Sequence, residues 1–156
     1  MIIETKNQDI LKSDIKYIAH QINCVTTTCK GLSEQIFKKY PNTNRYIDKS
    51  RRVGGETYFD FTNKDDRIIF HLAGQINPGK PKRSYPDRYD DRLNYFKKCI
   101  LSLEDLVEYL KVQYKIKEEI IIGFPYGIGC GLAGGNWDDY YEILDESKLK
   151  IILFKI

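Results

Sequence analysis

The 156-residue chain lacks the sequence features of several common protein classes. No apolar run reaches the roughly 18 residues that a membrane-spanning helix needs, and the first ten residues, MIIETKNQDI, have neither region of a signal peptide. The four cysteines form no CxxC pair and no zinc-site spacing. The net charge of +3 is too small to indicate nucleic-acid or membrane binding. We therefore expect a cytoplasmic protein with reduced thiols, no membrane partner, no metal and no cofactor, with a nuclear or host-cell location left open.

Two common nucleotide-binding motifs are also missing. No GxxxxGKS/T sequence occurs, and the glycines at 129–135 come too late in the chain to form the first turn of a dinucleotide-binding domain. The sequence contains no internal repeat, domain linker or low-complexity tract. Its length and its hydrophobic content of 42% fit a single globular domain spanning residues 1–156, and we expect a monomer.

The spacing of apolar residues predicts alternating strands and helices. A stripe that recurs every three or four residues from Leu93 to Tyr114 indicates one long helix, and the proline-rich segment 75–88 before it predicts a loop. The alternation favours an α/β sandwich with a mostly parallel central sheet. The predicted strands are 1–5, 16–25, 54–61, 67–74, 118–127 and 148–156, and the predicted helices are 31–40, 90–115 and 136–146.

Two segments, 20–35 and 124–139, each combine a buried strand, a loop of small or hydroxyl residues and a helix. Five of the eleven glycines lie between positions 127 and 135. Glycine permits positive φ and removes the Cβ that would block a ligand, and free N–H groups before a helix suit a phosphate. One such loop is often only a tight turn, but two in equivalent positions predict a ligand held between them at the carboxyl ends of the strands.

Four segments of the chain resemble the macro domain family, which binds ADP-ribose. They are QDIL at 8–11, IAHQINCV at 18–25, CKGLSEQIFKKYP at 29–41 and FPYGIGCGLAGGNW at 124–137. The resemblance implies a three-layer α/β/α fold with a mixed, mostly parallel six-stranded sheet. It also implies that the partner is ADP-ribose, an ADP-ribose derivative or an ADP-ribosylated macromolecule.

The resemblance assigns ligand contacts residue by residue. Asp9 would accept a hydrogen bond from the adenine amino group, and Ile10 would line the adenine pocket. Asn23 would contact the distal ribose, and Phe154 on the last strand would pack on the adenine. The two phosphate loops would be supplied by Lys30, Gly31 and Leu32, and by Gly127, Ile128, Gly129, Cys130, Gly131 and Leu132.

The family contains enzymes and non-catalytic readers. One enzyme branch, that of terminal ADP-ribose glycohydrolases and DNA de-ADP-ribosylating antitoxins, uses a lysine where this chain has Gln75. Its glycohydrolase members add an aspartate where this chain has Ala133. The run HQINC at 20–24 instead resembles the yeast-type ADP-ribose 1''-phosphate phosphatases, which makes Asn23 and His20 the catalytic candidates. Strand alternation places these two side chains on opposite faces, so a buried, structural His20 is the competing interpretation.

Three functions stay open at this point. The leading hypothesis is a hydrolase that acts on a small ADP-ribose derivative, most concretely ADP-ribose 1''-phosphate. The second is a hydrolase that removes ADP-ribose from protein or nucleic acid, and the third is a reader without activity. An acid or base would come from Asp87, Asp90 or Asp91, and the spacing does not choose among them.

Overall fold

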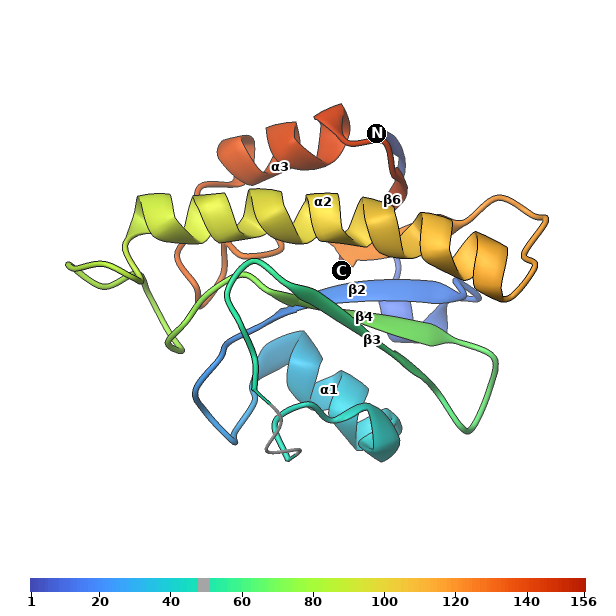
Figure 1. Cartoon of the computed structure of the whole chain (residues 1–156), viewed down its shortest axis with the longest axis horizontal. Coiled ribbons are helices and arrows are strands. Elements are labelled where there is room, and N and C mark those ends of the chain that lie inside the picture. The colour runs from blue at the N-terminus through green and yellow to red at the C-terminus, as the bar shows by residue number, and fades with distance from the viewer. Residues whose placement is uncertain (48–50) are drawn as a thin grey trace.

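The computed structural model (Figure 1) describes residues 1–47 and 51–156, which form a six-stranded sheet with helices on both faces. The strands are β1 (Ile2–Lys6), β2 (Tyr17–Ile22), β3 (Thr57–Phe61), β4 (Ile68–Ala73), β5 (Ile121–Pro125) and β6 (Lys150–Phe154). The helices are α1 (Gly31–Lys39), α2 (Tyr89–Gln113) and α3 (Trp137–Glu146), with short 3-10 turns η1 (Ile10–Lys12) and η2 (Pro41–Thr43). Helices α2 and α3 cover one face of the sheet and α1 covers the other.

The strand order is β1-β6-β5-β2-β4-β3. All neighbouring strands run parallel except β3, which pairs antiparallel with β4. The predicted mixed, mostly parallel six-stranded sheet between two helical layers is therefore confirmed. Every predicted strand and helix is present within the described ranges. Most are shorter than predicted by a few residues at their ends, whereas β1 is shifted by one residue and α2 begins one residue earlier than predicted.

The alternation of side chains along β2 divides the core into two clusters. Tyr17 and Ala19 belong to the cluster beneath α2 and α3, whereas Ile18 and Ile22 belong to the cluster beneath α1. A strand in the middle of such a sheet is buried on both faces, which explains why β2 and β4 are apolar along nearly their whole length. Successive side chains of β2 thus lie on opposite faces of the sheet, as strand alternation predicts.

The long helix α2 buries the predicted apolar stripe against the sheet. Phe96, Ile100 and Leu103 are almost fully buried there. The stripe was predicted to include Tyr114, and this is wrong: Tyr114 follows the last helical residue, is 50% exposed and meets the Phe61 ring at 5.1 Å. The helix ends because Lys115 takes a positive φ of 52°, which turns the chain away from the helix axis.

Neither a membrane span nor a metal centre emerges from the described part of the chain. Within residues 1–47 and 51–156, no helix combines the length and apolarity needed to cross a membrane. The same residues contain no cluster of three or more His, Cys, Asp or Glu side chains placed to hold a metal ion. The four cysteines, all within the described residues, are free thiols.

Candidate functional site: a cleft between two glycine loops

A cleft of about 400 Å³ opens where β2, β4 and β5 end. This volume is in the range of small-molecule sites. The cleft brings together most of the predicted site residues, namely the catalytic candidate His20 and the predicted ligand contacts Asn23, Lys30, Gly31, Leu32, Gly127, Ile128, Gly129, Gly131 and Leu132. It is also lined by residues that the sequence did not single out as ligand contacts, including Gln21, Ser33, Tyr46, Gln75, Pro78, Gly79 and Ala133.

The first wall of the cleft is the N-terminal turn of α1. Gly31 begins the helix with a φ of +62°, a conformation that glycine adopts without strain. Among the described residues no side chain caps this end, whereas Asp91 closes a capping box on α2 and Asn136 caps α3. The first-turn N–H groups of an uncapped helix lack intrahelical acceptors, and the helix dipole adds partial positive charge there. Gly31 and Leu32 line the cleft, so this turn can bind an anion.

The second wall is the loop between β5 and α3. Two tight turns close it, with hydrogen bonds from Ile128 N to Pro125 O (3.1 Å) and from Cys130 N to Gly127 O (2.9 Å). The N–H groups of Ile128 and Cys130 therefore donate within the loop. The N–H of Gly129, which lies between them, finds no protein acceptor among the described residues. The loop therefore presents backbone donors toward the cleft, opposite α1.

Asn23 stands at the end of β2, between the two walls, and is 7% exposed. Its Oδ1 accepts hydrogen bonds from Val25 N at 3.1 Å and from Thr26 N and Oγ1, both at 3.0 Å. Its backbone N–H donates to the Tyr46 hydroxyl (2.9 Å), and Arg52 donates to its carbonyl (2.9 Å). The oxygen of the side chain is thus occupied, and within the described residues no protein group accepts from its Nδ2. The amide is held so that only its NH₂ group is offered to a ligand.

The predicted adenine-binding residues lie beside the cleft rather than in its lining. Ile10 and Phe154 are both buried, and their side chains converge on Gly123, where an added Cβ would come within 3.2 and 3.0 Å of them. Phe154 pairs with Pro125, which does line the cleft. Asp9 caps the turn η1 through a hydrogen bond from Leu11 N (2.9 Å). These three residues lie outside the cleft lining, and their contact with adenine stays a prediction.

Cys130 is the one predicted phosphate-loop residue outside the cleft lining. Its thiol is half-buried against the core beneath α3 and points to the carbonyl of Ile128 at 3.4 Å. Burial raises the pKa of this thiol to about 11, so it is a protonated, unreactive side chain at neutral pH. Its contribution to the loop is packing.

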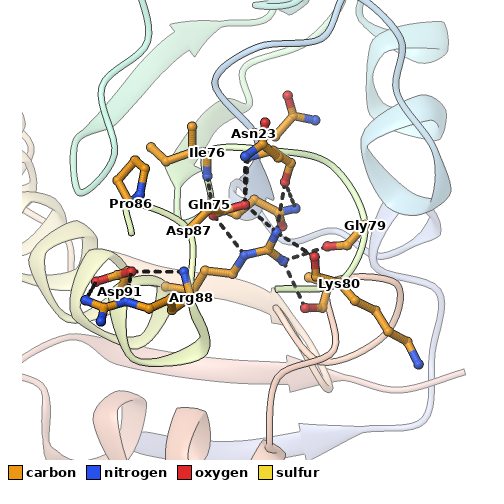
Figure 2. A network of polar contacts seen from close by, with 12 residues as sticks. Asn23, Gln75, Ile76, Gly79, Lys80, Pro86, Asp87, Arg88 and Asp91 are labelled. Carbon is orange, nitrogen blue, oxygen red and sulfur yellow. Dashed lines mark hydrogen bonds and ion pairs between the residues drawn. The ribbon is translucent and has the colours of Figure 1, made fainter. Parts of the chain in front are cut away.

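The loop 75–88 is fastened to the second wall by a buried ion pair. Arg92 and Asp87 are each 1% exposed, and the Arg92 guanidinium lies 2.8 Å from the Asp87 carboxylate. The same guanidinium donates to the carbonyls of Gly79 (2.6 Å) and Ala133 (3.0 Å), which both belong to residues lining the cleft. Figure 2 shows this network, in which Asp87 and the carbonyls of Gly79 and Lys80 accept hydrogen bonds from the guanidinium. One buried side chain therefore joins the loop 75–88 to the second wall of the cleft.

None of the three aspartates considered as an acid or base is available to the cleft. Burial raises the pKa of Asp87, but hydrogen bonds from Arg92 and from the backbone N–H groups of Ile76 and Asn77 more than offset this and hold its pKa below the usual value. Asp91 forms an ion pair with Arg88 at 2.8 Å (Figure 2). Asp90 is exposed on the first turn of α2, and none of the three lines the cleft.

The floor of the cleft carries an amide pair and a buried histidine. Gln21 Nε2 donates to Gln75 Oε1 at 2.6 Å, and Gln75 in turn donates to Asn77 O. His20 is 1% exposed and lies on the α1 side of β2, hydrogen-bonded to Ser33 and His71. Gln21 and Asn23 are two residues apart, so strand alternation points both side chains to one face, and this signal could have identified Gln21. Nothing local in the sequence marks Ser33 or His71.

Comparisons with known proteins agree with this fold. No protein-family model matches the chain. An uncharacterized 17.5 kDa protein in the tk-vs intergenic region of Enterobacteria phage T4 is 27% identical over 164 residues, covering 98% of this chain and 96% of that protein. The macrodomain of Mycobacterium tuberculosis DarG matches 100% of this chain and 98% of its own length, with a TM-score of 0.71 and 17% identity.

The macrodomain of Thermus aquaticus DarG gives a similar result, with a TM-score of 0.63, 16% identity and coverage of 100% and 99% of the two chains. The alphavirus structure P23pro-zbd matches 97% of this chain but only 21% of its own length, with a TM-score of 0.66 and 17% identity. The protein therefore has the macrodomain fold over its whole length. At these levels of identity the likeness establishes the fold, and the ligand must be argued from the cleft.

Proposed function

We propose that the cleft binds ADP-ribose and that the protein hydrolyses a small ADP-ribose derivative, most concretely the phosphate ester of ADP-ribose 1''-phosphate. One observation carries the proposal: the uncapped first turn of α1 and the amides of the β5–α3 loop face each other across a cleft of about 400 Å³. A diphosphate carries anionic oxygens on both phosphorus atoms and is matched by donors on both sides. The resemblance in four sequence segments and the macrodomain fold support the same ligand.

The remaining parts of the ligand follow from the positions around the two walls. Asn23, whose Oδ1 is already occupied, offers its NH₂ group to a hydroxyl of the distal ribose. Lys30 at the head of α1 adds positive charge beside the phosphates. Ile10 and Phe154 offer an apolar surface to the adenine ring at the edge of the cleft.

The proposed chemistry uses water rather than a lysine nucleophile. Gln75 occupies the position where one enzyme branch keeps its lysine, and it is held in an amide pair at the cleft floor. Ala133 occupies the position of that branch's aspartate and cannot transfer a proton. A hydrolase built on this cleft therefore needs another group to activate water.

Binding is tested by calorimetric titration with ADP-ribose, with AMP and ribose 5-phosphate as partial ligands. Asn23→Asp is the informative variant because it keeps the acceptor used by Val25 and Thr26 but replaces the NH₂ donor by a charged oxygen. We expect its affinity for ADP-ribose to fall at least about tenfold, which corresponds to about 1.4 kcal/mol. The same substitution at Asn63, exposed in the turn between β3 and β4, should leave the affinity unchanged. Absence of ADP-ribose binding by the unmodified protein would overturn the proposal.

Activity is tested on a panel of ADP-ribose 1''-phosphate, mono-ADP-ribosylated protein and ADP-ribosylated DNA. Release of phosphate from the first substrate supports the proposed reaction. Release of ADP-ribose from either macromolecule would replace it with the second hypothesis. Binding without any turnover would make the protein a reader.

A further inference from the structure

Both histidines of the chain lie in one row of hydrogen-bonded side chains beneath the cleft. His20 on β2 and His71 on β4 occupy paired positions of two adjacent parallel strands, and both point to the face covered by α1. Asp60 on the antiparallel strand β3 continues the row, and Ser33 in the first turn of α1 begins it. The row therefore starts at a helix that borders the cleft and crosses three adjacent strands.

The distances in this row are those of continuous hydrogen bonds. Ser33 Oγ lies 2.8 Å from His20 Nδ1, His20 Nε2 lies 2.6 Å from His71 Nδ1, and His71 Nε2 lies 2.9 Å from Asp60 Oδ2. Arg45 Nε donates to the same Asp60 oxygen at 2.8 Å. Ser33, 8% exposed, and His20 both line the cleft, whereas His71 is completely buried.

The protons in the row have one arrangement when both imidazoles are neutral and Asp60 is a carboxylate. A carboxylate only accepts, so His71 donates through Nε2 and must accept at Nδ1. His20 then donates through Nε2 and must accept at its own Nδ1. Ser33 is left as the donor to His20, although its Oγ also lies 3.2 Å from the Gln21 carbonyl. Each hydrogen bond in the row is therefore donated in the direction of Asp60.

The surroundings favour this neutral arrangement. Burial lowers the pKa of His20, and the nearby His71 lowers it further. Burial also lowers the pKa of His71, although Asp60 acts in the opposite direction. Phe37 of α1 packs its ring against both imidazoles, at 5.3 and 5.8 Å between ring centroids. On the other side, the contact with Arg45 keeps a positive charge beside Asp60.

We propose that this row is a proton relay that activates a water molecule in the cleft, with the Ser33 hydroxyl as the catalytic group. His20, His71 and Asp60 act through Ser33 and hold or carry the proton behind it. The inference rests on the proposed function, because the water needs an electrophile bound by the two loops. It supplies the group that Gln75 and Ala133 do not provide.

The step balances in atoms and charge. Water gives a proton to Ser33 Oγ while the Ser33 proton moves to His20 Nδ1 and the His20 Nε2 proton moves to His71 Nδ1. His71 becomes an imidazolium ion that is stabilised by the Asp60 carboxylate. The water oxygen forms a bond to the phosphorus of the ester, and the bond from phosphorus to the ribose oxygen breaks with its electron pair. The proton returns along the row and protonates the leaving oxygen through solvent, so the products are phosphate and ADP-ribose.

A spectroscopic test uses the fact that the chain has only two histidines. Protein labelled with ¹⁵N-histidine gives two imidazole spin systems, which His71→Asn assigns by removing one. The relay requires both rings to carry the proton on Nε2 in the unliganded protein at pH 7.5. A proton on Nδ1 of His20 would overturn the relay, because Ser33 would then be the acceptor of that hydrogen bond.

A kinetic test uses Ser33→Ala, Ser33→Thr and the control Ser84→Ala, whose serine is exposed in the loop 75–88. We expect Ser33→Ala to lower kcat at least about 100-fold while KM and ADP-ribose affinity stay within threefold. Threonine keeps the hydroxyl and should restore kcat to within tenfold of the unmodified protein. Asp60→Asn should lower kcat as well, since an amide can favour the opposite tautomer of His71.

The outcomes separate the relay from the proposed function. Unchanged kcat in Ser33→Ala, or equal losses of kcat and ADP-ribose affinity in that variant, would overturn the relay. The proposal that the unmodified protein binds ADP-ribose would still stand. Binding of ADP-ribose by the unmodified protein without turnover of ADP-ribose 1''-phosphate or of the two macromolecular substrates would also overturn the relay. Failure to bind ADP-ribose overturns the proposed function, and the relay falls with it even if the histidine tautomers are as expected.

Discussion

Replacing Arg92 by methionine should destabilise the protein by about 3–5 kcal/mol, the cost of leaving a buried charge without its partner. Asp87 would keep its carboxylate at 1% exposure with only the N–H groups of Ile76 and Asn77 and the Asn77 side chain as donors. The carbonyls of Gly79 and Ala133 would lose their guanidinium donor in the same change. Methionine fills a similar volume, so the measured loss reports on charge and hydrogen bonding. Urea denaturation at pH 7.5 gives the difference in the free energy of unfolding.

The neighbouring ion pair provides the matched control. Arg88 pairs with Asp91 at the same distance of 2.8 Å, but its side chain is 52% exposed. Water screens an exposed pair of this kind, so Arg88→Met should lower the free energy of unfolding far less than Arg92→Met. Equal losses in Arg92→Met and Arg88→Met would refute the argument that burial makes the first pair decisive. A double variant with Asp87→Leu should recover part of the loss, because the unpaired charge is gone.

The same variant should also weaken ligand binding. Arg92 joins the loop 75–88 to the β5–α3 loop, so its loss frees these two segments, which both line the cleft, to move apart. We expect the ADP-ribose affinity of Arg92→Met to fall under conditions where circular dichroism shows the protein folded. Affinity equal to that of the unmodified protein would show that the walls keep their spacing without Arg92.

Two further predictions concern the buried histidines and the glycine loop. The pKa of His20 and of His71 is lowered on folding, so below about pH 6.5 the unfolded chain binds more protons than the folded protein. The free energy of unfolding should therefore fall as the pH decreases, by up to about 1.4 kcal/mol per pH unit for each histidine. Denaturation midpoints that stay constant from pH 7.5 to 5.5 would contradict this. Gly135→Ala should lower the melting temperature, because the added Cβ would lie 2.5 Å from the Gly129 carbonyl oxygen. Gly131→Ala should leave the melting temperature unchanged, because its Cβ would meet nothing within 4 Å. Thermal unfolding compares the two variants, and equal melting temperatures would contradict the close approach at Gly135.

Much of the fold was readable from local sequence patterns. The alternation in β2 and the stripe along α2 follow from the fixed periods of strands and helices, so they predicted both the elements and their buried faces. Tyr114 was assigned to the wrong side because periodicity does not reveal where a helix stops. The glycines at 127–135 and Gly31 marked the two loops, since positive φ and close approach restrict the choice of residue.

By itself, then, the sequence determined the strands, the helices and the two loops that border the cleft. Only the tertiary structure decided which distant side chains meet there. His20 and His71 are 51 residues apart and touch because β2 and β4 pair in one particular register. In the sequence, Arg92 is only a charged residue of a predicted helix. In the folded protein it is buried against two loops and Asp87. Local patterns record what each segment must bury, whereas the contacts between segments depend on strand order and register, which arise from packing of the whole chain.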